Sequence, residues 1–216
     1  MKQRILLAIA IALPIVFVVI LILGPGRGEK ETPLPVFWNV PEFTLIDQDS
    51  TPFSSTELKG HVWVASFVYT NCPDFCPLIT KHMANLRDEL KRDGKLGEVR
   101  LLSITVDPVR DTPGVLRAYA QNFNATKPDW VFLTGPFDKV VPLINEGFKL
   151  TALHNMPADS QHHAHSTVDT LPAKYTVAHT DRIVLIDKDG QVRATYQTNE
   201  PESLQQLRKD LQQLID

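Results

Sequence analysis

The longest apolar stretch of the chain begins at Ile5 and ends at Leu23, a run of 19 apolar residues. At about 1.5 Å per residue, a helix of this length nearly crosses the ~30 Å hydrocarbon core of a bilayer. Lys2 and Arg4 precede the run, so we expect its start to stay on the cytoplasmic side. The pattern predicts a single transmembrane helix that anchors the chain through residues 1–24. A cleaved signal peptide is the alternative, which the length of the run and the lack of a small-x-small site after it disfavour.

The composition changes after this run. Residues 25–40 are rich in proline, glycine and charged side chains, which is typical of a tether. From residue 41 onward, apolar and polar positions follow the periods of strands and helices. We therefore expect three parts: a membrane anchor over 1–24, a linker over 25–40 and one folded domain over 41–216.

Two kinds of apolar pattern predict the elements of that domain. Short runs of β-branched and aromatic residues between polar turns indicate buried strands. Apolar residues that recur every three or four positions indicate helices with one packed face. The predicted strands are a short hairpin within Pro41–Gly60, then Val62–Tyr69, Val99–Val106, Trp130–Leu133, Arg182–Ile186 and Val192–Tyr196. Four helices are predicted. The first holds the stripe Ile79, Met83, Leu86 and Leu90, and the second begins at Pro113 after an N-cap at Thr112. The third covers Phe137–Phe148, and the last holds the stripe Leu204, Leu207, Leu211 and Leu214.

The order of these elements predicts an α/β, thioredoxin-like fold. A βαβ half precedes a ββα half, and one further helix is inserted between them. Ligand chemistry in α/β sheets concentrates at the carboxyl ends of the strands. The residues that follow the strand Val62–Tyr69 are therefore the first place to look for a functional site.

Charge narrows the classes of partner. The chain has 22 Lys and Arg residues, of which three lie in residues 1–28, so the remainder has 19 against 25 Asp and Glu residues. Phosphate binding needs a basic face, so a mildly acidic domain argues against nucleic acid as a partner.

The only two cysteines, Cys72 and Cys76, lie in the segment TNCPDFCP between a predicted strand and a predicted helix. A helix N-terminus lowers the pKa of a thiol, so we expect reactive thiolates here. A disulfide across so small a loop adds little stability, which indicates that the pair serves chemistry. One helical turn apart, both sulfurs can face one metal ion, and two soft thiolates favour Cu(I), with Zn(II) as the rival. A disulfide across the pair remains feasible, so it stays open beside the metal role that the spacing suits.

Seven histidines are candidates for a further ligand. His179 precedes the strand Arg182–Ile186, a junction that faces the cysteine pair in a thioredoxin topology, although its position alone also fits a surface histidine. His162, His163 and His165 form a cluster in a polar stretch, a composition that can bind copper or zinc and also occurs in plain loops. The other histidines are expected to have no metal role: His61, His82 and His154.

Three motifs resemble those of a known family. They read FVYTNCPDFCP at 67–77, ITVDPVRDTP at 104–113 and VAHTDRIVLIDKDG at 177–190. With the apolar run at the start, they make the chain similar to the SCO/SenC proteins, the copper chaperones of cytochrome c oxidase assembly. The resemblance runs from about Pro41 to the C-terminus.

The resemblance implies a copper site, for Cu(I) or Cu(II), formed by the thiols of Cys72 and Cys76 and the imidazole of His179. It also implies that the two cysteines form a disulfide when oxidised. Thioredoxins place a cis-proline near the position of His179, and its absence from KYTVAHTDR leaves room for a metal. Asp107 and Arg110 belong to the second motif, where they either orient a ligand or form a strand-end cap and ion pair.

The family also implies partners and a location. We expect two protein partners: the CuA-bearing subunit of cytochrome c oxidase, which accepts the copper, and a protein that donates it. We also expect the N-terminal helix to attach the protein to the membrane. The soluble domain is expected on the periplasmic side of a bacterial inner membrane. The stretch 151–174 is longer than the usual link of the family, so His162, His163 and His165 are candidates for an auxiliary copper site.

Two other functions use the same residues. A thiol–disulfide reductase would use Cys72 and Cys76 as its redox-active pair and keep the oxidase's CuA cysteines reduced, which would make the protein an enzyme and not a metallochaperone. A redox or copper sensor would use oxidation of the pair to switch a partner interaction. A peroxidase is disfavoured because the chain shows no PxxxTxxC arrangement.

Overall fold

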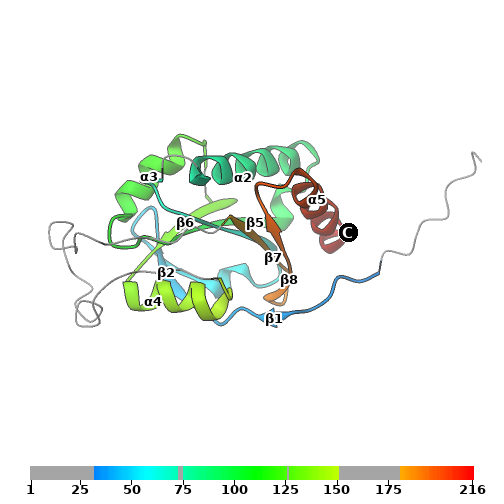
Figure 1. Cartoon of the computed structure of the whole chain (residues 1–216), viewed down its shortest axis with the longest axis horizontal. Coiled ribbons are helices and arrows are strands. Elements are labelled where there is room, and N and C mark those ends of the chain that lie inside the picture. The colour runs from blue at the N-terminus through cyan, green and yellow to red at the C-terminus, as the bar shows by residue number, and fades with distance from the viewer. Residues whose placement is uncertain (1–31, 73–74, 126, 151–180) are drawn as a thin grey trace, which may run out of the picture. The chain divides into compact units, whose positions relative to one another are not determined.

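An eight-stranded mixed β-sheet organises the chain between Leu34 and Asp216 in the computed structural model (Figure 1). The structure describes residues 32–72, 75–125, 127–150 and 181–216. The strands are β1 Trp38–Asn39, β2 Thr44–Asp47, β3 Pro52–Ser54, β4 Val62–Val68, β5 Val99–Thr105, β6 Trp130–Thr134, β7 Arg182–Ile186 and β8 Gln191–Gln197. Their order across the sheet is β1-β8-β7-β4-β5-β6-β2-β3.

The centre of the sheet consists of the three parallel strands β4, β5 and β6. β4 and β5 pair from Val62 opposite Val99 to Val68 opposite Thr105. Every residue of β4 is buried, as its run of β-branched and aromatic residues predicts. On its other side β4 pairs with β7, which runs antiparallel to it. Because β4 and β5 are parallel and in register, the residues that follow them lie at the same edge of the sheet.

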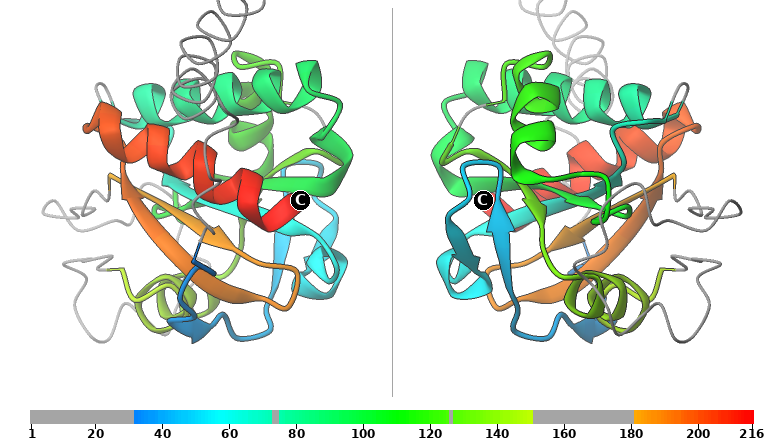
Figure 2. Two further views of the ribbon diagram at one scale, coloured as in Figure 1. Left: turned by 90° about the vertical axis from the view of Figure 1, so that its right-hand side faces the viewer. Right: turned by 90° about the vertical axis from the view of Figure 1, so that its left-hand side faces the viewer.

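Helices cover both faces of this sheet. α2 Phe75–Arg92, α3 Pro113–Gln121 and α5 Pro201–Ile215 lie on one face, and α4 Phe137–Pro142 lies on the other (Figure 1, Figure 2). The short helical turns are η1 Ser55–Leu58, η2 Leu96–Glu98 and the π-helical η3 Leu143–Gly147, which continues α4. The face that α2 buries matches its apolar stripe, and α5 buries its stripe except for Leu214, which is half-buried while Ile215 is buried.

The sheet separates two apolar cores. One core holds the α2 stripe, including Ile79 and Met83, together with Leu207 of α5. The other holds Phe67 of β4 and Phe148, whose rings meet edge to face with centroids 4.9 Å apart. The strand that leads to the cysteines is thus packed on both faces, which gives the site that follows it a rigid support.

Most predicted elements are present. The two long parallel strands, the helix with the Ile79 stripe, the hairpin of β7 and β8 and the final helix are confirmed. Thr112 caps α3 by accepting a hydrogen bond from the backbone of Val115, and Pro113 is the first helical residue, as expected. β1 was not predicted: it lies within the stretch 25–40 and pairs with β8.

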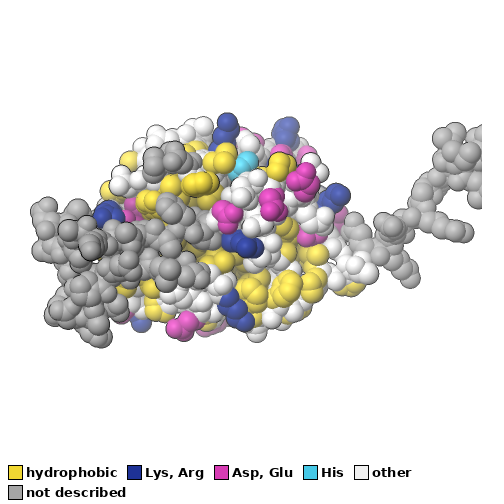
Figure 3. All heavy atoms as spheres, viewed as in Figure 1, with side chains coloured by type: hydrophobic (Ala, Val, Ile, Leu, Met, Phe, Trp, Pro, Cys, Tyr) yellow, Lys and Arg dark blue, Asp and Glu magenta, His cyan; other side chains and the backbone are white. Residues whose placement is uncertain are grey.

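The predicted anchor lies outside the described residues, so it stays a prediction. Among the residues that the structure describes, no helix is long and apolar enough to cross a bilayer. On the face shown in Figure 3, side chains of Lys and Arg lie among those of Asp and Glu. The described part of that face carries no patch of a single sign of charge.

Candidate metal centre

The two cysteines lie where β4 passes into α2. β4 ends at Val68, Cys72 follows in the loop, and Cys76 is the second residue of α2. Both side chains are buried, with exposed fractions of 5% and 4%. The two residues carry thiols and are not joined by a disulfide. The predicted position at a strand end and a helix start is therefore confirmed.

Backbone amides hold both sulfurs. The amide of Cys76 donates to Sγ of Cys72 at 3.4 Å, and the amide of Tyr69 donates to Sγ of Cys76 at 3.5 Å. The hydroxyl of Tyr69 also hydrogen-bonds the side chain of Cys72. Donors directed at sulfur stabilise its negative charge, so this arrangement suits thiolates that share a soft cation.

The acidity of Cys76 differs from the prediction. Burial raises the pKa of the Cys76 thiol, the hydrogen bond from the Tyr69 backbone lowers it, and the side chain of Cys72 raises it; together these effects bring the pKa to about 12. The expectation of a lowered pKa at the helix N-terminus is wrong for Cys76, because the loss of hydration outweighs the helix end. At neutral pH this thiol keeps its proton, which it must release when it binds a metal ion.

Asp107 and Arg110 form the ion pair that the sequence suggested. Nη1 of Arg110 lies 3.0 Å from Oδ2 of Asp107, whose side chain is fully buried. The carbonyl of Asp107 accepts the amides of Arg110 and Asp111, so the loop after β5 closes on itself. A direct role in orienting a ligand stays a prediction.

A second carboxylate, which the sequence analysis did not single out, reaches the cysteine loop. Asp111 has an exposed fraction of 1%. Its Oδ1 accepts the hydroxyl of Thr70 at 2.6 Å, and its Oδ2 accepts the hydroxyl of Thr105 at 2.6 Å. Burial raises the pKa of Asp111, and these hydroxyl donors lower it in part. In the sequence, only its position within the motif ITVDPVRDTP could have pointed to a role for Asp111.

The predicted imidazole ligands lie outside the described residues: His179, His162, His163 and His165. Among the described residues, no three Cys, His, Asp or Glu side chains are grouped closely enough to hold a metal ion. The described part of the site therefore supplies two sulfur donors, and the third donor is a prediction. His82 lies on α2, where burial lowers its pKa and the charges of Arg208 and Lys81 lower it further.

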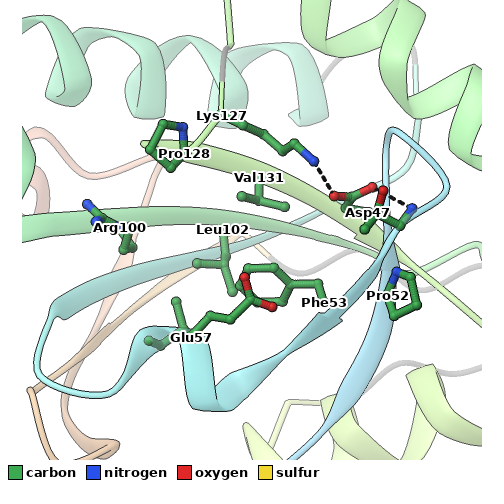
Figure 4. Close-up of a pocket in the computed structure, with 11 residues that line it drawn as sticks. Asp47, Pro52, Phe53, Glu57, Arg100, Leu102, Lys127, Pro128 and Val131 are labelled. Atoms are coloured by element: carbon green, nitrogen blue, oxygen red, sulfur yellow. Dashed lines mark hydrogen bonds and ion pairs between the residues drawn. The ribbon is translucent and has the colours of Figure 1, made fainter.

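A cavity of about 320 Å³ lies in another part of the fold. It opens between the β2–β3 hairpin and the strands β5 and β6, and none of its lining residues belongs to the cysteine loop (Figure 4). Leu102 and Val131 form part of its apolar wall, and the ammonium of Lys127 points to the carboxylate of Asp47 at one end. Lys127 and Asp47 neutralise each other at that end. The other charged lining residues, Glu57 and Arg100, form no ion pair with each other across the cavity in the described structure (Figure 4).

The chain is similar in sequence to known proteins. A model of the SCO1/SenC family matches residues 39–216. A SCO1 protein homolog of Bacillus subtilis is 41% identical over 101 residues, which are 47% of this chain and 51% of that protein. A Stutzerimonas stutzeri protein named for copper binding is 30% identical over 177 residues, which are 82% of this chain and 77% of that protein.

A solved structure shares the fold. It is that of BsSco, which is described as a member of the Sco family of cytochrome c oxidase assembly proteins with a disulfide switch. It superposes with a TM-score of 0.67 at 28% identity, and the match covers 86% of this chain and 98% of that chain. The predicted thioredoxin-like α/β class is therefore confirmed for residues within the match. In the sequence match described above, the chain spans about half (51%) of the length of the SCO1 protein homolog of Bacillus subtilis.

Proposed function

The chain belongs to the SCO1/SenC family, and we propose that it binds copper and acts in the assembly of cytochrome c oxidase. The observation that carries the proposal is the pair of buried thiols, Cys72 and Cys76, each of which accepts a backbone N–H at its sulfur. The name of the Stutzerimonas stutzeri relative and the description of BsSco support it.

Copper is the cargo of this site and not a resident cofactor. Two thiolates are soft donors, which favour Cu(I) over the harder divalent ions. A buried site also excludes water, which would otherwise compete for the ion and promote oxidation of the thiols. The high pKa of Cys76 means that capture of the ion displaces a proton at this sulfur.

We further propose roles for the histidines, for partner proteins and for the N-terminal segment. His179 is the third ligand, His162, His163 and His165 are an auxiliary site, and the copper passes by ligand exchange to the CuA site of the oxidase. A copper donor protein loads the site. Residues 1–24 anchor the protein in a bacterial inner membrane, with the soluble domain on the periplasmic side. The sequence motifs, the apolar run from Ile5 to Leu23 and the family support these roles.

A thiol–disulfide reductase is the second candidate. Two neighbouring thiols and the disulfide switch described for BsSco favour it. The raised pKa of Cys76 does not separate the two roles, because disulfide exchange and metal binding both need this sulfur as a thiolate. The copper-binding name of the Stutzerimonas stutzeri relative favours the metal-binding role.

A Cu(I) titration separates the two functions. The reduced full-length chain in detergent competes with a chromogenic chelator for Cu(I), and we expect about one ion bound per chain. Cys76→Ser should abolish tight binding. His179→Ala should weaken it by roughly tenfold or more, since even residues that only support a ligand cost 10–100-fold when lost.

The matched control is His82→Ala, which removes an imidazole of α2 and should leave the affinity unchanged. Failure of the wild-type chain to bind Cu(I), together with intact reduction of a disulfide in a CuA-bearing domain, would exclude the copper-binding function in favour of the reductase.

A further inference from the structure

We propose that Asp111 is a positioning residue for the thiol pair. It fixes Thr70 at the entrance of the cysteine loop and thereby holds the backbone amide that contacts the sulfur of Cys76. The inference rests on the proposed function, since it concerns the arrangement of the two thiols for a shared ion.

The carboxylate of Asp111 joins two strand ends. Thr70 lies two residues after β4, and Thr105 is the last residue of β5. Each hydroxyl donates to one carboxylate oxygen at 2.6 Å, and the amide of Thr70 donates to the same carboxylate at 3.2 Å. Hydrogen bonds to a buried carboxylate are roughly twice as strong as those between neutral groups. The two ends are therefore held together by one buried group.

Tyr69 connects Thr70 to the sulfur of Cys76. Tyr69 immediately precedes Thr70, and its amide donates to Sγ of Cys76 at 3.5 Å. The carbonyl of Tyr69 accepts the amide of Cys72 at 3.3 Å. The peptide bond between Tyr69 and Thr70 is thus held on one side by Asp111, while the groups of Tyr69 contact both cysteines. A shift of Thr70 would move the Tyr69 amide away from Cys76.

The neighbouring Asp107 belongs to the same motif. The carboxylate of Asp107 pairs with Arg110 of its own loop, and its backbone carbonyl closes that loop. The hydrogen bonds that the described residues give to the carboxylate of Asp111 come from Thr70 and Thr105, on two different strand ends. Asp111 therefore ties the loop after β5 to the cysteine loop.

The test uses Thr70→Val, which keeps the shape of the side chain and removes the hydroxyl donor to Asp111. Thr70→Ser is the conservative variant, because it restores that donor. Asp111→Asn is a second approach, since the amide keeps one acceptor oxygen and loses the charge. All are made in the full-length chain, and the urea unfolding of each variant is recorded alongside.

Two readouts are needed. The first is the Cu(I) affinity by chelator competition, and the second is the equilibrium constant between dithiol and disulfide in glutathione buffers without copper. Residues that orient a ligand typically change metal affinity 10–100-fold when lost. We expect Thr70→Val to weaken Cu(I) binding about tenfold and to shift the thiol–disulfide constant, and Thr70→Ser to stay within about threefold of the wild type in both.

Two results would overturn the inference. In the first, Thr70→Val and Asp111→Asn match the wild type in both readouts. In the second, they lower only the free energy of unfolding, which would make the contact a plain strand-end cap. Its failure is distinguishable from failure of the proposed function, because the thiol–disulfide constant tests Asp111 even when the wild-type chain binds no copper.

Discussion

Buried polar side chains form hydrogen bonds between the central strands, in addition to those of the backbone. Ser66 of β4 and Ser103 of β5 lie opposite each other, and their hydroxyls are 2.9 Å apart. Oγ of Ser103 also accepts the indole N–H of Trp130 at 3.0 Å. All three residues have no exposed surface, so each hydrogen bond replaces one that water would make. One hydroxyl thus links three parallel strands beneath the cysteine loop.

We predict that Ser103→Ala lowers the free energy of unfolding by about 1–3 kcal/mol, because it leaves the indole N–H of Trp130 buried without a partner. Ser66→Ala is the matched control, since the bond between Ser103 and Trp130 survives, and a smaller loss is expected. Urea unfolding of the full-length chain measures both. Equal losses for the two variants would contradict the assignment of the indole contact to Ser103.

The site could be predicted from the sequence only in part. Cys72 and Cys76 were identified because they are the sole cysteines and stand at a strand end. Asp111 was missed because it contacts Thr70, which is 41 positions away and approaches only when β4 and β5 pair. The raised pKa of Cys76 was also missed, since burial depends on the packed core and not on the local sequence.

At the scale of elements, α2 shows how an apolar stripe fixes a helix to the sheet. Met83 has no exposed surface and packs in the core with Ile79 and Leu86. The helix ends at Arg92, and Gly94 follows with a φ of 71°, a left-handed conformation that glycine adopts at low cost. Since Cys76 lies in the first turn, the packing of this stripe also places one of the two thiols.

Met83→Ala should therefore cost about 2–5 kcal/mol of the free energy of unfolding, through lost burial and the cavity left behind. Lys81→Ala, at an exposed position of the same helix, is expected to stay within about 0.5 kcal/mol of the wild type. Chemical denaturation followed by circular dichroism tests the pair. A loss below about 1 kcal/mol for Met83→Ala would contradict its place in the core.

The elements with strong periodicity were predictable, and those that depend on distant contacts were not. The run VWVASFV and the leucine stripe of the last helix carry their own patterns, and both elements are present. β1 has two residues, and it forms because Phe37 and Val40 donate backbone hydrogen bonds to Val192 and Gly190. Such a strand has no pattern of its own for a sequence to show.

At the scale of the whole domain, the β2–β3 hairpin is joined to the edge of the sheet by polar contacts. The side chain of Gln48 accepts the amide of Phe132, which extends the pairing of β2 with β6. Asp47 accepts the amides of Asp49 and Thr51 and forms an ion pair with Lys127. Burial opposes the charge of Asp47, but its hydrogen bonds prevail and lower its pKa below the usual 3.8.

This shift predicts an acid-sensitive contribution to stability. Because the folded-state pKa is lower than the unfolded-state value, the stabilisation is present above about pH 4 and is lost as the pH falls through the folded-state pKa. Asp47→Asn should be less stable than the wild type by about 1–3 kcal/mol at pH 7, and the difference should shrink below about pH 4. Urea unfolding at pH 7, 5 and 3 measures it.

Asp93→Asn, just beyond the exposed end of α2, is the control and should change the free energy of unfolding by no more than about 0.5 kcal/mol at pH 7. A difference between Asp47→Asn and the wild type that stays constant down to pH 3 would show that the charge of Asp47 does not stabilise the hairpin.

The central claim is that Cys72 and Cys76 together hold one copper ion. Copper K-edge X-ray absorption of the Cu(I)-loaded full-length chain counts the neighbours of the metal directly. We predict two sulfur neighbours and one nitrogen, and one sulfur fewer in Cys72→Ser. A spectrum of the wild-type protein with no sulfur neighbour, or with a single one that Cys72→Ser leaves unchanged, would contradict the account.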